Sequence, residues 1–229
     1  AFLCNPEYEH TRDPEGRDYT LSDKSVAELA EPIIRNHERQ RSLSLAVQDD
    51  GVPVVDITTG THIFAAAFGC AVHTYKNDNP CAIPLVKTPE EADRLATPNV
   101  SDSPMLQRVF EMARVVGEKL GSVVPISPPD VQTGFDIACQ IWNKEDIFVA
   151  MANESTKDSV KRLAAKCVEL LVAFFDAYRE EFPDFSPCHC PDAWAPPGRG
   201  VWVSNDECGS ISNSHFEEFC LPELVTLSE

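Results

Sequence analysis

The sequence lacks a long apolar run and an excess of basic residues. Its longest apolar stretch, Ile63 to Val72, is interrupted by Gly69 and falls short of the ~18 to 20 residues that cross a bilayer. Against 19 Lys and Arg stand 37 Asp and Glu, a formal charge of -18 over 229 residues. Such a surface repels nucleic acids and anionic membranes, so we expect neither as a partner.

Several motifs of common enzyme classes are also absent. The sequence contains no Gly-x-Gly-x-x-Gly, no phosphate loop ending in Gly-Lys-Ser/Thr, no Gly-x-Ser-x-Gly and no His-Glu-x-x-His. These absences argue against nucleotide binding and against the common hydrolase classes.

The cysteines do not form the pattern of a disulfide framework. They are odd in number, scattered, and partly set within apolar helical patterns: Cys4, Cys70, Cys81, Cys139, Cys167, Cys188, Cys190, Cys208 and Cys220. This usage is typical of reduced thiols and predicts a cytoplasmic location. Because the chain opens at Ala1 without an initiator Met or a leader, we expect it to be a processed or excised portion of a longer protein.

The first 50 residues form a region of their own in this interpretation. Residues 1 to 20 show no periodicity and are expected to be irregular. Helical spacing from Ser22 to Val47 predicts N-terminal helices, with Pro32 either bending the first helix or starting a second. We therefore divide the chain into this lead-in, residues 1–50, and a second unit, residues 51–229.

Strand and helix patterns alternate in the second unit. Short apolar segments predict strands at residues 52–56, 122–126 and 201–203. Apolar stripes and capping signals predict helices over residues 62–68, 88–95, 103–121, 135–141, 156–182 and after Ser212. The alternation predicts an α/β fold with parallel strands and outer helices, in which the loops after the strands hold the chemistry.

Polar residues follow two of the predicted strands. Asp56 ends the first, and His62 lies just beyond it. A carboxylate at this position can orient a cationic group or act as an acid or base, and the alternative is a turn Asp that caps its own loop. Asn205, Asp206 and Glu207 follow the last strand, where capping of the loop before Ser212 is the competing explanation.

A metal site is a further hypothesis. Cys188, His189 and Cys190, with Cys208 and Asp206 beyond them, combine ligands that Zn²⁺ accepts. The spacing Cys-x-Cys differs from the usual Cys-x-x-Cys of zinc knuckles. The alternative is a set of free thiols in a loop that packs on Trp194.

The end of the chain resembles the uroporphyrinogen decarboxylase superfamily. Residues 201–212 match its strand ending in Asp or Ser followed by a helix that starts at Ser, and residues 216–222 match its Phe-x-x-Phe-x-x-Pro pattern. Three weaker segments agree in order, residues 64–72, 128–138 and 146–154. The resemblance spans most of residues 50–224, and only the terminal motif is fairly specific.

The resemblance implies a (β/α)₈ TIM barrel that is incomplete in this chain. Members of the superfamily are longer, so Glu229 would fall after roughly five of the eight strands. A barrel missing its last strands leaves an unpaired edge and an exposed interior. We therefore expect another chain or segment to complete it, or a homodimer.

The resemblance also implies an enzyme, and two of its branches are relevant. The methyltransferases pass a methyl group between a corrinoid protein and a thiol through Zn²⁺; the decarboxylases need no cofactor and hold a polycarboxylate with an Arg-Gln-Ala-Gly-Arg-Tyr motif, which this sequence lacks. We expect a methyltransferase-like member acting on a small or corrinoid-bound substrate, with Asp56, Asn205 and Asp206 at the barrel mouth and His62 and His189 as secondary candidates. The alternatives are a porphyrinogen-type decarboxylase and a non-catalytic binding or assembly module.

Overall fold

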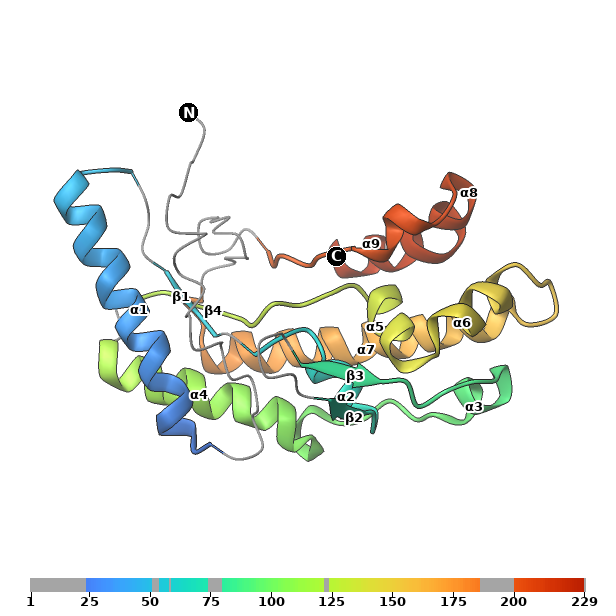
Figure 1. Cartoon of the computed structure of the whole chain (residues 1–229), viewed down its shortest axis with the longest axis horizontal. Coiled ribbons are helices and arrows are strands. Elements are labelled where there is room, and N and C mark those ends of the chain that lie inside the picture. Colours follow the sequence, from blue (N-terminus) through green and yellow to red (C-terminus); the bar gives the residue numbers. More distant parts are fainter. Residues whose placement is uncertain are drawn as a thin grey trace.

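The fold is mostly helical with a small amount of parallel strand pairing. The computed structural model describes residues 24–50, 54–57, 59–73, 80–121, 124–185 and 200–228. Figure 1 shows α1 and α4 at one end of the molecule, and the C-terminal segment above α5, α6 and α7 at the other. Among the described helices, none has both the length and the apolar character that a bilayer crossing requires.

The N-terminal helix α1 (Val26–Val47) is one continuous element that packs against α4. Ser25 and Glu28 form a capping box at its start. The possible second helix at Pro32 is not seen, because α1 runs through this residue. Pro32 and Glu28 are both exposed, so water can satisfy the Glu28 carbonyl that lacks the proline N–H.

Parallel pairing joins β1 (Val55–Asp56) and β4 (Ile126–Ser127). Val55 lies opposite Ile126, and Asp56 lies opposite Ser127. Isolated bridges join Val86 to Trp142 and Gln132 to Ser204, and both are also parallel. The predicted parallel direction is therefore confirmed for these segments, although the second strand begins at Ile126, where the predicted strand over 122–126 ends.

An antiparallel hairpin interrupts the parallel pattern. β2 (Ala71–His73) pairs with β3 (Cys81–Ile83), and residues 74–79 between them lie outside the described part. The sequence predicted only extended chain here. A connection this short cannot make a parallel crossover, which needs a dozen or so residues, so the two strands must run in opposite directions.

The prediction of a regular strand over residues 201–203 is wrong. Only the bridge at Ser204 pairs this extended stretch with Gln132. The described strands form two two-stranded sheets, and no closed barrel is seen among the described residues. Strands of two or three residues with isolated bridges pair over too short a length to close a cylinder.

Several of the remaining helices follow the predicted capping signals, whereas the helix over residues 144–151 was not predicted. Their bounds are α2 (Ile63–Ala67), α3 (Pro89–Arg94), η1 (Val100–Asp102), α4 (Pro104–Leu120), α5 (Gly134–Ile141), α6 (Lys144–Met151), α7 (Lys157–Glu181), η2 (Glu207–Ser210), α8 (Asn213–His215), the π-helix η3 (Phe216–Cys220) and α9 (Leu221–Ser228). Thr88, Ser103 and Ser212 cap helices as predicted. The helix predicted over residues 156–182 begins one residue later, because Thr156 is the N-cap of α7.

The buried face of α7 forms the centre of the core. Phe174 packs edge-on against Phe64 and Phe110, with ring centroids 5.2 and 5.5 Å apart. One turn along, Tyr178 is fully buried, and its hydroxyl donates a hydrogen bond to the Ser127 carbonyl at 3.1 Å. This bond ties the longest helix to β4 and satisfies both buried polar groups.

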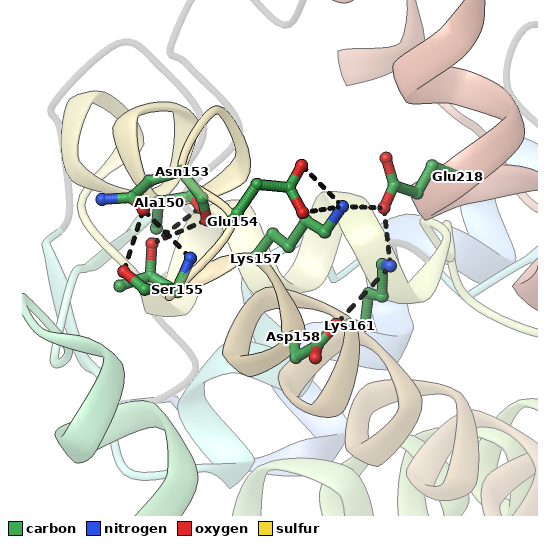
Figure 2. Close-up of polar contacts among 9 residues, drawn as sticks. Ala150, Asn153, Glu154, Ser155, Lys157, Asp158, Lys161 and Glu218 are labelled. Carbon is green, nitrogen blue, oxygen red and sulfur yellow. Dashed lines mark hydrogen bonds and ion pairs between the residues drawn. The ribbon is translucent and has the colours of Figure 1, made fainter.

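The C-terminal segment folds back onto α7. Figure 2 shows Glu218 of η3 between Lys157 and Lys161, with N···O distances of 3.2 and 2.7 Å. These pairs are partly exposed and contribute little to stability by themselves. The neighbouring Phe219 is buried, and the ammonium group of Lys161 lies 5.4 Å from its ring centroid.

Further along this segment, α9 meets the start of α5 at Gly134. A Cβ atom on Gly134 would lie 2.5 Å from Glu223 Oε2, 2.6 Å from Val168 Cγ2 and 2.8 Å from the Ala164 carbonyl oxygen. Only glycine therefore allows α5, α7 and α9 to approach this closely.

We predict that Gly134→Ala destabilises the protein by about 2 to 3 kcal/mol through overpacking, despite the better helix propensity of alanine. Gly209→Ala is the matched control, since a Cβ at Gly209 meets nothing within 4 Å, and its effect should stay within about 0.5 kcal/mol. Urea unfolding followed by circular dichroism measures both. Equal stability of the two variants would show that this close approach does not constrain the fold.

Candidate functional site

A cavity of ≈ 270 Å³ lies where the loops after the parallel segments meet the β2–β3 hairpin. On one side it is lined by the hairpin through Pro80, Cys81 and Ala82. On the other side its wall consists of residues from α5, from the start of α6 and from the loop at Glu207. In α/β proteins, ligands bind beyond the carboxyl ends of parallel strands, and two wall residues follow such segments in the chain: His62 follows β1, and Glu207 follows the bridge at Ser204.

Each polar wall residue is placed by the end of an element. His62 directly precedes α2, and Gln140 lies in the last turn of α5. Lys144 is the first residue of α6, which Asn143 caps by accepting hydrogen bonds from the N–H groups of residues 145 and 146. Glu207 begins η2. The Lys144 ammonium and the Glu207 carboxylate form an ion pair at 2.6 Å across the cavity wall.

A buried carboxylate holds the Glu207 loop in place. Asp136, in the first turn of α5, is 2% exposed and accepts hydrogen bonds from the backbone N–H groups of Asp206 at 2.8 Å and Glu207 at 3.0 Å. Burial raises the pKa of Asp136 to about 6, and these two hydrogen bonds oppose the shift. Just before it, the Thr133 N–H donates to the Ser204 carbonyl at 2.8 Å, so the loop is joined to α5 at both positions.

A chain of side-chain amides runs beside this contact. Gln132 Nε2 donates a hydrogen bond to Asp206 Oδ2 at 2.6 Å. Gln140 Nε2 in turn donates to Gln132 Oε1. The carboxylate of Asp206 is thus connected through two glutamines to the cavity wall, although Asp206 itself is exposed.

His62 is the most deeply buried polar residue of the wall. It is 1% exposed, and its Nδ1 has no hydrogen-bond partner. Burial lowers the pKa of His62 to about 4, so the imidazole is neutral at pH 7. A neutral imidazole in this position can donate or accept a hydrogen bond, but it is a weak base.

The structure brings together some of the sequence-predicted residues and separates others. His62 lines the cavity with Glu207, whose neighbours Asn205 and Asp206 lie on the same loop. Asn205 Oδ1 is buried without a hydrogen-bond partner. Asp56 lies away from this wall, on β1, where the Ser127 hydroxyl is 3.5 Å from its Oδ1. The cavity wall therefore includes His62 and Glu207, whereas Asp56 lies on β1 in the β1–β4 pair.

The structure describes only some of the predicted zinc ligands. Cys188, His189 and Cys190 lie outside the described residues. The thiol of Cys208 is directed to the Asn205 carbonyl at 2.9 Å. Within the described ranges, no group of three or more His, Cys, Asp or Glu side chains is arranged to hold a metal ion. The described residues thus do not fit a zinc ion.

Sequence reasoning missed Asp136, Gln132 and Gln140. Asp136 and Gln140 lie four residues apart and share one face of α5, which is otherwise apolar, and Gln132 lies just before the helix in the bridge to Ser204. A polar stripe on a buried helix requires partners, and this signal could have indicated the site. Lys144 was missed because it follows a cap, where a charged residue is usually solvated.

A second buried carboxylate lies beneath the site. Glu223 of α9 is 6% exposed, and neither of its oxygens has a hydrogen-bond partner. Burial raises the pKa of Glu223 to about 8, and the nearby N–H groups of Phe135 and Gly134 offset this shift only in part. The charge of Asp136 and the buried thiols of Cys167 and Cys220 lie close to it, and none of these three groups compensates its ionisation.

The burial of the Glu223 carboxyl group makes the stability of the protein depend on pH. The folded-state pKa of Glu223 lies above its ordinary value of 4.5. The contribution of Glu223 to the free energy of unfolding is therefore fully present below pH 4.5 and is lost as the pH rises through 8. We predict that Glu223→Gln matches the wild type at pH 4.5 and exceeds it at pH 8.5 by on the order of 3 to 5 kcal/mol.

Urea unfolding at both pH values measures this difference. Asp136 titrates in both proteins, so the comparison isolates Glu223. The exposed Glu217→Gln provides the same chemical change as a control and should leave the pH dependence unaltered. A Glu223→Gln variant with the wild-type pH dependence would contradict the assignment.

Comparisons with known proteins give one informative result. No protein-family model matches the sequence, and no curated protein matches it. Among solved structures, a methyltransferase from Methanosarcina mazei is similar to this chain, with a TM-score of 0.70 and 16% sequence identity. The match covers 94% of this chain and 57% of the methyltransferase, so this chain spans little more than half of that protein's length. At this identity the likeness shows a shared fold.

Proposed function

We propose that this chain is part of a methyltransferase-like enzyme that transfers a methyl group between a corrinoid or small substrate and a thiol. The observation that carries the proposal is the fold shared with the Methanosarcina mazei methyltransferase over 94% of the chain. The cavity lined by His62, Lys144 and Glu207 lies beyond the parallel segments, where such a fold places its chemistry. The resemblance to the uroporphyrinogen decarboxylase superfamily points to the same reaction class.

Methyl transfer to a thiol makes two demands on a site. The thiol must lose its proton, and its sulfur must then attack the methyl carbon while the leaving group keeps the electron pair of the bond that breaks. Lys144 is the cation of the described wall, and a nearby ammonium stabilises a thiolate. With its pKa of about 4, His62 is suited to orienting a substrate by a hydrogen bond and unsuited to removing the thiol proton.

The two other functions considered have weaker support. A porphyrinogen-type decarboxylase must bind several carboxylates. The described wall carries a single Lys or Arg side chain, Lys144, which can face one thiolate but not several carboxylates. A non-catalytic module would have no need of a cavity whose wall holds an imidazole nitrogen, His62 Nδ1, without a hydrogen-bond partner. We therefore favour methyl transfer over both.

The proposal extends to partners and location. The methyltransferase is longer than this chain, which supports a second chain or segment, or a second copy, that completes the barrel. Three further proposals come from the sequence alone. They are the division into residues 1–50 and 51–229, a cytoplasmic location, and the assignment of Asp56, Asn205 and Asp206 to the substrate mouth.

We predict that the 229-residue chain accelerates transfer of the methyl group from methylcobalamin to 2-mercaptoethanol. The absorbance change on loss of the methyl group from the corrinoid measures the rate, with and without added Zn²⁺. Lys144→Met should lower kcat/KM by about tenfold or more, because it removes the charge that stabilises the thiolate. Lys119→Met, on the exposed last turn of α4, is the matched control and should retain the wild-type rate.

The same protein should not decarboxylate a porphyrinogen. Turnover of uroporphyrinogen, or a methyl-transfer rate that does not depend on the protein under either metal condition, would contradict the proposed function.

A further inference from the structure

A second cavity, of ≈ 710 Å³, lies between α4 and α7. One wall belongs to α4 and the opposite wall to α7, and the stretch 97–101 that leads into α4 forms the rest. Its described lining residues are all different from those of the cavity at His62. A cavity of this volume is large enough for a small molecule.

The α7 wall is anionic at its two ends and apolar between them. Glu169 and Glu180 are both exposed and lie eleven positions apart, which is about three turns, so the two carboxylates project from the same face of α7. At about 1.5 Å per residue, they are separated by about 16 Å along the helix. The wall between them consists of Leu170, Ala173 and Ala177.

The deepest lining residues of this cavity are also apolar. Phe110 of α4 and Leu170 of α7 line it, and both are buried in the core. The two alanines beside them are too small to fill the space between the helices. A hydrocarbon chain that lies along this wall therefore covers apolar surface between the two carboxylates, which is favourable in water.

The charges of Glu169 and Glu180 are not compensated within the described wall. Arg114 is its single Lys or Arg side chain, and it is paired with Glu181, with Arg114 Nη2 donating to Glu181 Oε2 at 2.9 Å. Glu169 accepts a hydrogen bond from the Thr97 hydroxyl at 2.6 Å, which orients the carboxylate and leaves its charge in place. Each end of the α7 wall can thus receive a cationic group.

The polar side chains of the remaining wall already bind within the protein. Asn99 Nδ2 and the Ser101 hydroxyl donate to the carboxylate of Asp102 at 2.8 and 3.3 Å, and Gln107 Nε2 donates to the Val100 carbonyl at 3.0 Å. A bound peptide has carbonyl groups all along its backbone that need donors. These contacts therefore disfavour a peptide and favour a ligand that is polar only where it meets the two carboxylates.

We infer that this cavity binds a linear aliphatic polyamine, with one terminal ammonium group at Glu169, the other at Glu180, and the hydrocarbon chain against Ala173 and Ala177. The excess of negative charge on the whole chain, -18, attracts such a cation. This site is separate from the cavity proposed for methyl transfer, so either proposal can fail without the other.

Three amines test the assignment in isothermal titration calorimetry at low salt. Spermine and 1,12-diaminododecane both have thirteen bonds between their terminal nitrogens, which span about 16 Å at about 1.2 Å per extended bond. The third probe, 1,6-diaminohexane, has the charge of the longer diamine but about half its length. We expect both long amines to bind at least about fivefold more tightly than 1,6-diaminohexane, because only they reach both carboxylates at once.

A pair of glutamate variants locates the binding. Glu180→Gln removes one anionic end and should weaken the binding of both long amines about three- to fivefold. It should weaken the binding of 1,6-diaminohexane at most about twofold, since this probe can still bind at Glu169. Glu217→Gln makes the same chemical change on the exposed side of η3 and should leave all three affinities unchanged.

Three results would overturn the inference. Equal affinity of the two diamines for the wild type would mean that the acidic surface binds cations without regard to their length. A preference for 1,12-diaminododecane that persists in Glu180→Gln would mean that the apolar chain alone is bound. Equal effects of Glu180→Gln and Glu217→Gln would place the binding elsewhere on the molecule.

Discussion

The candidate site depends on the hydrogen bonds that Asp136 accepts from the backbone of Asp206 and Glu207. The stretch around Ser204 pairs with Gln132 through a single isolated bridge, outside the two described sheets, so strand pairing alone holds it weakly. Asp136 replaces that missing pairing with two charge-assisted bonds from the first turn of α5. Because Glu207 follows directly, the ion pair with Lys144 and the shape of the cavity wall depend on the same carboxylate.

Local signals in the sequence predicted the helices well. The capping box at Thr88 and Glu91, the Ser103 cap and the ending of α4 at Gly121 all depend on residues a few positions apart, and each was found. Strands were harder to predict, because strand pairing depends on residues that are distant in the sequence. The stretch at 201–203 is apolar enough for a strand but has one bridging partner. The β2–β3 hairpin was not predicted, although Asn77, Asp78 and Asn79 between its strands are residue types that favour turns.

The site was predictable only in part for the same physical reason. Polar residues after an apolar segment indicated Asn205 to Glu207 and His62, and this loop and His62 do reach one cavity. Asp136 interacts with a loop 70 residues away, so no local spacing reveals it. The local signal is its interval of four from Gln140, which indicates a shared helix face without indicating the partner.

The most direct test of this account is amide hydrogen exchange at residues 206 and 207. In the wild type we expect both N–H groups to be protected, because Asp136 accepts their hydrogen bonds. Asp136→Ala should accelerate their exchange at least about tenfold while the buried face of α7 keeps its protection, which shows that the variant is folded. Unchanged exchange at 206 and 207 in a folded Asp136→Ala variant would contradict the central role given to this carboxylate.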